Sequence, residues 1–191
     1  MRKLKLQVQM SIDGYVAGPK GEMDWMVWDW DDALKNYVDA LTYPVDTILL
    51  GRKMAGGFIS HWANVADDPN HPEYDAGKKF TDTPKVIFSK TLREPAWENT
   101  DIASGNLADE ISRLKRQNGK DMIVYGGASF VSALIKESLI DAFHLFVNPV
   151  VLGDGLTIFK GINHKQNLKL VNSIPFNCGI VLLHYEASSK L

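Results

Sequence analysis

The sequence is poor in cysteine and has no long apolar run, and each absence excludes a class of protein. Cys178 is the only cysteine in 191 residues, so the chain cannot form an internal disulfide, which is typical of a reducing compartment. No apolar stretch approaches the ~20 residues that span a membrane. The first ten residues alternate polar and apolar side chains, where a secretory signal would be continuously apolar. We therefore expect a cytoplasmic protein that does not enter a membrane.

Charge of either sign is not in excess, and motifs for metal or hydrolase chemistry are missing. The 21 basic and 23 acidic residues give a net charge of −2, whereas nucleic-acid-binding domains usually carry a strong basic excess. The five histidines show no spacing typical of metal ligands, and the sequence has no GxSxG nucleophile motif. We expect no nucleic-acid partner, no metal site and no serine hydrolase chemistry.

The sequence does contain the composition and patterning of an α/β protein. Hydrophobic residues make up 45% of the chain and charged residues 23%, which is close to the average for globular domains. Leu4, Leu6, Val8 and Met10 alternate with polar residues and predict a strand with one buried face. The acidic start of residues 29–46 suits a helix N-terminus. We predict further strands at 47–50, 85–89, 122–125, 142–151, 168–174 and 179–185, helices beginning near Lys53 and spanning 107–117 (capped by Asn106) and 128–136, and a long surface loop at 61–83.

Strands and helices alternate along most of the predicted chain, and only strands remain at its end. Alternation of this kind requires a parallel sheet with right-handed crossovers. The last two strands are joined by a turn and should form an antiparallel pair. We therefore predict a single domain over residues 1–191, with a three-layer α/β sandwich whose mostly parallel central sheet ends in antiparallel C-terminal strands.

Three predicted strands end in short polar segments with residue types that bind phosphate. Ligands of open α/β sheets bind at the carboxyl ends of the strands, where these segments should lie together. Each segment has an ordinary alternative, namely a tight turn for the glycines or a solvated side chain for the cations. Their recurrence favours one ligand with several phosphates, held by cations and by N–H groups at helix N-termini. The segments are Gly51-Arg52-Lys53, Ser89-Lys90 and Gly126-Gly127-Ala128-Ser129-Phe130.

Acidic and aromatic residues near the N-terminus are candidates for contact with a substrate. Asp13 follows the first strand, and its side chain either hydrogen-bonds a substrate or closes an Asx-turn with Gly14. Between residues 24 and 32, four acids alternate with three tryptophans, and an acid desolvated beside an indole can donate a proton because its pKa rises. These residues fit a capped helix start with tryptophans in the core equally well. They are Asp24, Asp29, Asp31 and Asp32, with Trp25, Trp28 and Trp30.

Several motifs together resemble one superfamily. They are SIDGYVA at 11–17, Gly51-Arg52, Ser89, Gly126-Gly127-Ala128 and PVVLGDG at 149–155. With them, the chain from Lys3 to Tyr185 resembles the dihydrofolate-reductase-like superfamily, and most closely the C-terminal reductase domain of bifunctional riboflavin-biosynthesis proteins. The resemblance implies that NADPH lies along the sheet edge and that the chain forms a homodimer.

The resemblance also implies a role for each candidate residue. Ala17 would lie near the nicotinamide, with Asp13 and Asp32 as catalytic residues and Asp13, Trp25 and Trp28 against the substrate. The remaining residues would bind the rest of the cofactor. These are Gly51, Arg52 and Lys53 at the adenosine phosphates, Ser89 and Lys90 at the adenosine end, and Gly126, Gly127, Ala128, Ser129 and Phe130 at the pyrophosphate.

Two positions depart from the patterns of these relatives. Met54 stands where dihydrofolate reductases usually have threonine, and Tyr125 stands where riboflavin-pathway reductases usually have glutamate before the glycine pair. The main hypothesis is an NADPH-dependent reductase of a small heterocycle. The alternative is a catalytically silent nucleotide-binding protein with the same fold, and a purely structural use of the fold ranks last.

Overall fold

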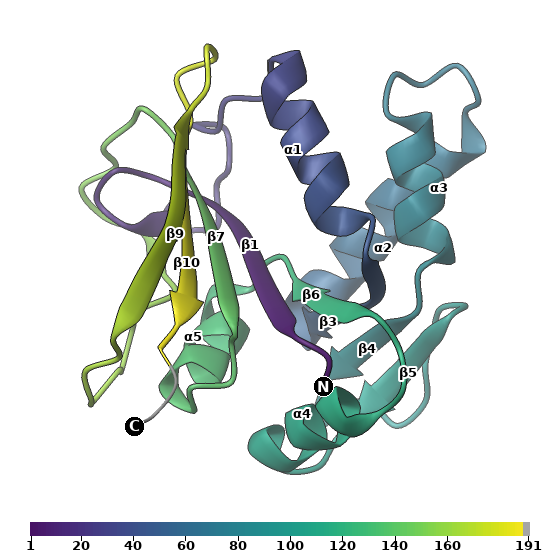
Figure 1. Cartoon of the computed structure of the whole chain (residues 1–191). Helices are drawn as coiled ribbons and strands as arrows, with labels where there is room; N and C mark the ends of the chain where they lie inside the picture. Colours follow the sequence, from purple (N-terminus) through teal and green to yellow (C-terminus); the bar gives the residue numbers. More distant parts are fainter. Residues whose placement is uncertain (189–191) are drawn as a thin grey trace.

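The computed structural model describes residues 1–188, in which ten strands form two sheets. The strands are β1 (Leu4–Met10), β2 (Tyr15–Ala17), β3 (Val45–Gly51), β4 (Lys85–Phe88), β5 (Thr100–Ala103), β6 (Asp121–Val124), β7 (Ala142–Val147), β8 (Leu156–Thr157), β9 (Leu168–Pro175) and β10 (Val181–Ala187). Eight of them form the large sheet in the order β5-β4-β3-β6-β1-β7-β10-β9 (Figure 1), and β2 pairs with β8. Neighbours from β5 to β7 are parallel, whereas β10 is antiparallel to β7 and β9.

Five helices cover the two faces of the large sheet. They are α1 (Asp32–Thr42), α2 (Arg52–Asp67), α3 (Tyr74–Asp82), α4 (Leu107–Arg116) and α5 (Ala128–Lys136). Helices α4 and α5 pack on one face through residues such as Ile111 and Leu134, and α1, α2 and α3 pack on the other. The predicted three-layer α/β sandwich, with its mostly parallel sheet and antiparallel C-terminal strands, is confirmed. None of the helices within residues 1–188 combines the length and apolarity needed to cross a bilayer.

Strand β1 explains how the alternating N-terminal pattern builds the core. Its apolar residues Leu4, Leu6, Val8 and Met10 are all buried in the cluster that α4 and α5 cover. Burial of a side chain of this size contributes about 1.5–3 kcal/mol before conformational entropy is subtracted. The alternate residues lie on the opposite face, so β1 has one apolar and one largely polar face. In the strand order it lies inside the sheet, between β6 and β7.

The prediction of a long surface loop at residues 61–83 is wrong. Helix α2 continues to Asp67, and residues 74–82 form α3, which packs along it. The polar residues that suggested a loop make only the turn between these helices. Gly77 marks the close approach of the two helices, because a Cβ there would lie 2.7 Å from Val65 Cγ1 and 2.8 Å from the Ala66 nitrogen.

The sequence did not predict the short strands β2, β5 and β8, because their pairing depends on residues elsewhere in the chain. Strand β5 pairs only with β4 at the edge of the sheet, and β2 and β8 are too short to show a period. The strand predicted at 142–151 ends at Val147 instead, because the chain turns at Asn148 and Pro149. The predicted cap Asn106 is confirmed, since its side chain accepts hydrogen bonds from the N–H groups of Ala108 and Asp109.

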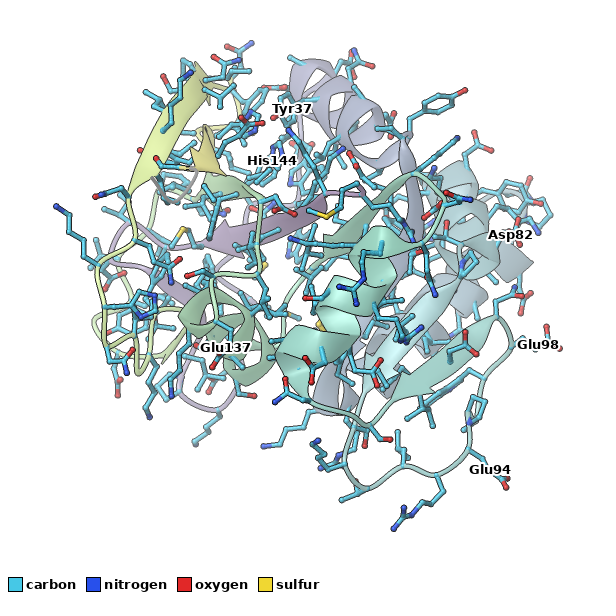
Figure 2. The ribbon with its side chains drawn as sticks, turned by 60° about the horizontal axis from the view of Figure 1, so that its bottom comes forward. Tyr37, Asp82, Glu94, Glu98, Glu137 and His144 are labelled. Atoms are coloured by element: carbon cyan, nitrogen blue, oxygen red, sulfur yellow. The ribbon has the colours of Figure 1, made fainter. Side chains whose placement is uncertain are left out.

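A buried polar group lies between α1 and the sheet. Figure 2 shows Tyr37 of α1 next to His144 of β7, and the Tyr37 hydroxyl lies 2.8 Å from His144 Nδ1. The His144 ring stacks on His184 of β10, with the ring centres 4.1 Å apart. Burial raises the pKa of Tyr37 to about 12, so its hydroxyl stays protonated where it shares this hydrogen bond with Nδ1.

Candidate functional site

The loops that follow the parallel strands meet at the carboxyl edge of the large sheet. Gly51 pairs with Phe88 at the ends of β3 and β4, and Leu49 of β3 pairs with Val124 at the end of β6. The segments after β4, β3 and β6 are therefore neighbours, as ligand binding at this edge requires. Strands β1 and β7 end at the same edge, and the loops after them lie together at the left of Figure 1.

A cavity of about 220 Å³ opens between the loops after β3 and β6. It brings together residues that the sequence assigned to phosphate binding at two separate strand ends. A volume of this size suits part of a dinucleotide, such as a phosphate and its ribose, rather than the whole molecule. The lining residues are Gly51, Arg52, Lys53, Met54, Phe88, Gly127, Ser129 and Phe130.

Two glycines give this cavity its shape. A Cβ on Gly51 would lie 2.8 Å from Phe130 Cβ, so only glycine lets the end of β3 approach α5 this closely. Gly127 has φ +80°, in the left-handed region that other residues rarely adopt, and it forms the start of α5. Gly126 is buried and Ala128 is the first residue of α5, so both flank the cavity.

Two helix N-termini open into the cavity. Gly51 precedes α2 and Gly127 precedes α5, and within residues 1–188 no side chain caps either helix with a hydrogen bond. Residues of both first turns line the cavity, and uncapped N–H groups at a helix N-terminus attract an anion. Arg52 and Lys53 add two exposed cations at the start of α2. This end of the sheet edge fits a phosphate group.

Ser89 and Lys90 lie beside this cavity and order the loop after β4. The buried Ser89 hydroxyl accepts hydrogen bonds from the N–H groups of Thr91 and Leu92, at 3.1 and 2.9 Å. The Lys90 ammonium donates to the carbonyls of Ser104 and Gly105, at 2.8 and 2.7 Å. These contacts join the loops after β4 and β5, and the role of both residues at the adenosine end stays a prediction.

The two positions that depart from the relatives have different surroundings. Met54 lines the cavity, and its sulfur lies 3.5 Å from the place of a Cβ on Gly126. Tyr125 belongs to an aromatic cluster under α2 and α3, where it stacks on Phe58 with ring centres 5.6 Å apart. Tyr125 is partly buried there, and desolvation raises the pKa of its hydroxyl, so the side chain is neutral.

Asp13 connects the loop after β1 to the loop after β7. Its Oδ1 accepts the N–H of Leu152 at 3.1 Å, and its Oδ2 accepts the N–H of Gly153 at 2.7 Å. The Ser11 hydroxyl and these N–H groups hold the pKa of Asp13 below its usual value, so the carboxylate stays ionised. The turn at Gly14 is closed by the backbone, from the Gly14 N–H to the Ser11 carbonyl, rather than by an Asx-turn.

Ala17 ends β2 directly above the start of β8. It is nearly buried, and its strand partner is Leu156. Gly155 is needed there because a Cβ on it would overlap the Ala17 carbonyl oxygen. The specific motifs at 11–17 and 149–155 thus form one structure, in which small residues allow two loops to touch.

The acids and tryptophans before α1 fall into different environments. Asp31, rather than Asp32, caps α1: its carboxylate accepts the N–H groups of Leu34 and Cys178, at 2.9 and 3.2 Å, and these bonds lower its pKa. Asp32 is the exposed first residue of α1. Trp30 packs in the core beneath α1, whereas Trp25 is half-buried and Trp28 is 64% exposed.

Asn148 organises this end of the edge and was missed by the sequence analysis. It is fully buried just after β7, where its Oδ1 accepts the N–H of Val27 at 2.9 Å. Its Nδ2 donates to Gln9 Oε1 at 2.7 Å and to the Phe146 carbonyl at 3.2 Å. Asn148 thus ties the tryptophan-containing loop to β1 and β7. The available signal was a lone polar residue within an otherwise apolar run.

Comparisons with known proteins agree on one family. The family model described as RibD C-terminal domain matches residues 2–182. The uncharacterized protein YyaP of Bacillus subtilis is 34% identical over 97% of this chain and 95% of its own length. The riboflavin biosynthesis protein RibD of Corynebacterium ammoniagenes is 22% identical over 80% of this chain, which spans only 44% of that protein.

Solved structures show the same fold at low sequence identity. RibD of Acinetobacter baumannii superposes with a TM-score of 0.70 and 18% identity, covering 99% of this chain and 59% of the other. A deaminase and 5-amino-6-(5-phosphoribosylamino)uracil reductase of Thermotoga maritima superposes with a TM-score of 0.67 and 16% identity, covering 98% of this chain and 57% of the other.

Proposed function

Since the chain belongs to the RibD C-terminal domain family, we propose that it is an NADPH-dependent reductase of a small planar heterocycle. The cofactor would lie along the carboxyl edge of the large sheet, with its phosphates in the cavity between the loops after β3 and β6. The cavity carries this proposal. Two open helix N-termini and two cations converge there around glycines that leave room for a ligand.

The 2′-phosphate of NADPH is assigned to Arg52 and Lys53. Cations at a helix N-terminus are unfavourable unless an anion lies between them, and the exposed side chains at the start of α2 are free to fold around one. Gly127, Ser129 and Phe130 at the start of α5 are assigned to the pyrophosphate. The Phe130 N–H already donates to the Gly127 carbonyl, so the other N–H groups of the first turn and the Ser129 hydroxyl would donate to the ligand.

Bound NADPH would supply a hydride to the substrate. The chain would supply orientation, with Ala17 as the small residue beside the nicotinamide and Trp25 and Trp28 against the substrate. Asp13 is engaged by two backbone N–H groups and stays ionised, so we assign it to holding the loops together. Asp32 is retained as the proton donor because Asp31 is committed to capping α1, and a bound substrate would have to desolvate the exposed Asp32 carboxyl.

Titration with NADPH and NADH, followed by tryptophan fluorescence, tests the cofactor assignment. Replacing Arg52 and Lys53 together by alanine should weaken NADPH binding about 10–100-fold, the value of one or two charge-assisted hydrogen bonds, and leave NADH nearly unchanged. Lys136→Ala is the matched control, because it removes an exposed cation at the C-terminal end of α5, away from the cavity. Equal losses for both cofactors would show that the 2′-phosphate does not lie there.

The alternative function is nucleotide binding without turnover. Met54 and Tyr125 favour it, because neither supplies the hydroxyl or carboxylate usual at these positions in the relatives. NADPH oxidation measured with pterins, pyrimidines and quinones separates the two proposals. Binding of NADPH with no oxidation by any acceptor would support the silent protein, and turnover of one acceptor would exclude it.

We further propose a cytoplasmic homodimer formed through β9. This strand forms the edge of the large sheet, and its residues Leu168, Leu170 and Val171 are largely exposed. An exposed edge with apolar side chains favours association with another chain. Leu170→Lys should shift the molar mass measured by light scattering from dimer to monomer, whereas an unchanged mass would place the contact elsewhere.

A further inference from the structure

The surface beyond the proposed nicotinamide position differs from the cofactor cavity. It is formed by residues 11–31 and 148–159, which are the segments after β1 and β7, and we call it the substrate-end surface. Backbone contacts join its two segments: the Ile12 N–H donates to the Val150 carbonyl at 2.9 Å, and the Val27 N–H donates to Asn148 Oδ1 at 2.9 Å. Asp13 adds the bonds to Leu152 and Gly153 described above. The two segments therefore form one connected wall.

Large apolar side chains are exposed on this wall. The exposed fractions are 63% for Ile12, 53% for Met23, 64% for Trp28 and 66% for Val151. These residues belong to the two segments that the hydrogen bonds join, and contiguous exposed apolar area often marks a binding site. An indole face favours a flat aromatic ring, which it contacts over a large area with little loss of side-chain entropy.

The charges of the substrate-end surface are unsuited to a phosphate. Lys20 is its only lysine or arginine, against six aspartates and glutamates. The nearby N-terminus of α1 is capped by Asp31, whose carboxylate accepts a hydrogen bond from the Leu34 N–H. In contrast, the N-termini of α2 and α5 have no side-chain cap within the described residues and lie beside Arg52 and Lys53. The two ends of the sheet edge therefore differ in charge, with cations at the cavity and mostly acidic residues on the substrate-end surface.

We propose that the substrate is a planar ring system that carries no phosphate and is neutral or positively charged. This inference rests on the proposed reductase function, because it assigns the chemistry of the second ligand in the same site. Apolar side chains supply the contact area, and the carboxylates repel a phosphorylated compound. Asn148 is the positioning residue, since it fixes the tryptophan-containing loop over the end of β7.

Riboflavin and FMN are matched probes, because they share one planar ring and differ by a phosphate. The protein is first titrated with NADP⁺, which tests the cofactor assignment on its own and cannot transfer a hydride to the probe. Each flavin is then titrated into the NADP⁺-saturated protein, or into the free protein if NADP⁺ does not bind, and flavin fluorescence is measured. Riboflavin should bind at least about 10-fold more tightly than FMN at low salt, and the difference should shrink at high salt.

Two variants locate the probe. Trp28→Ala should raise the riboflavin dissociation constant about 10-fold or more, which is the effect of losing one ring contact. The NADP⁺ dissociation constant should not change. Replacing Asp24 and Asp29 together by lysine should narrow the preference for riboflavin over FMN. Glu137→Lys is the control for charge, because Glu137 is exposed at the far end of α5 (Figure 2). This variant should bind riboflavin and FMN as the wild-type protein does.

Three results would overturn the inference. FMN binding as tightly as riboflavin would show that the surface accepts a phosphate. Failure of riboflavin to bind up to its solubility limit would remove the planar-ring assignment, even if NADP⁺ binds. Conversion of a dimer into a monomer by Trp28→Ala, measured by light scattering, would show that the exposed apolar side chains serve a second copy of the chain instead.

Discussion

Acidification from about pH 7.5 to about pH 5 should destabilise the fold through His144. This residue is 4% exposed, stacks on His184 and shares a hydrogen bond with Tyr37. Burial, followed by the charges of His184 and Lys5, lowers its pKa from 6.5 to about 3. The unfolded chain therefore takes up a proton near pH 6.5 that the folded protein excludes. The stabilisation is complete above that pH and is lost progressively as the pH falls toward about 3.

The size of the effect follows from the two pKa values. At pH 5 the imidazole is about 97% protonated in the unfolded chain and about 1% protonated in the fold, which corresponds to a loss of about 2 kcal/mol relative to pH 7.5. Burial also lowers the pKa of His184, which adds to the loss in the same direction. Carboxylates with lowered pKa values, such as Glu186 bonded to Lys3, lose their contribution only at lower pH.

Urea unfolding at intervals between pH 7.5 and 5 measures this loss. The free energy of unfolding should fall by about 2 kcal/mol or more in the wild-type protein and by much less in His144→Gln, which keeps an acceptor for Tyr37 but does not titrate. His61→Gln is the control, because His61 is exposed on α2. A decline just as steep in His144→Gln, or an imidazole NMR titration of His144 near pH 6.5, would refute the reasoning.

Three further predictions concern the site. Gly51→Ala should cost about 1–3 kcal/mol of stability and weaken the binding of NADPH, because the new Cβ would clash with Phe130. By contrast, Gly57→Ala, in open space on α2, should stabilise the fold by about 0.5–1 kcal/mol, and equal effects by thermal unfolding would contradict this. Asn148→Ala should cost about 2–4 kcal/mol and speed hydrogen exchange in the loop before α1, and unchanged exchange would oppose its positioning role. Asp13→Asn should speed exchange only at residues 152 and 153, and a loss of activity without that change would favour a direct catalytic role.

Local patterns predicted the parts of the fold that depend on neighbouring residues. Strand β1 follows from alternation, and α5 begins at Ala128 and ends at Lys136 as its glycine start and apolar spacing indicate. The carboxyl-edge position of the phosphate-binding candidates follows from topology, because parallel strands all end on the same side. The error at residues 61–83 arose because glycine is typical of loops, whereas Gly77 lies within α3 and allows that helix to pack closely against Val65 of α2.

The candidate site likewise contains residues that the sequence identified and residues whose roles only the fold explains. Gly51, Arg52, Lys53, Gly127, Ser129 and Phe130 were identified from the chemistry of strand ends, and the fold brings them around one cavity. Asp13 could be identified only as a polar residue after a strand, because its partners Leu152 and Gly153 lie 139 and 140 residues further along the chain. Asn148 stands out locally only as a polar residue in an apolar run, and its role could not be predicted because the N–H that it binds belongs to Val27.

By itself, the sequence determined the elements, the parallel sheet and the edge at which a nucleotide would bind, because periodicity, helix starts and strand ends are local properties of the chain. Only the tertiary structure decided which acids are committed to backbone N–H groups, which tryptophans are exposed and which helix N-termini remain open. Those properties depend on contacts between residues far apart in the chain. They separate a cavity that fits phosphate from a surface with exposed apolar and acidic side chains at the other end of the same edge.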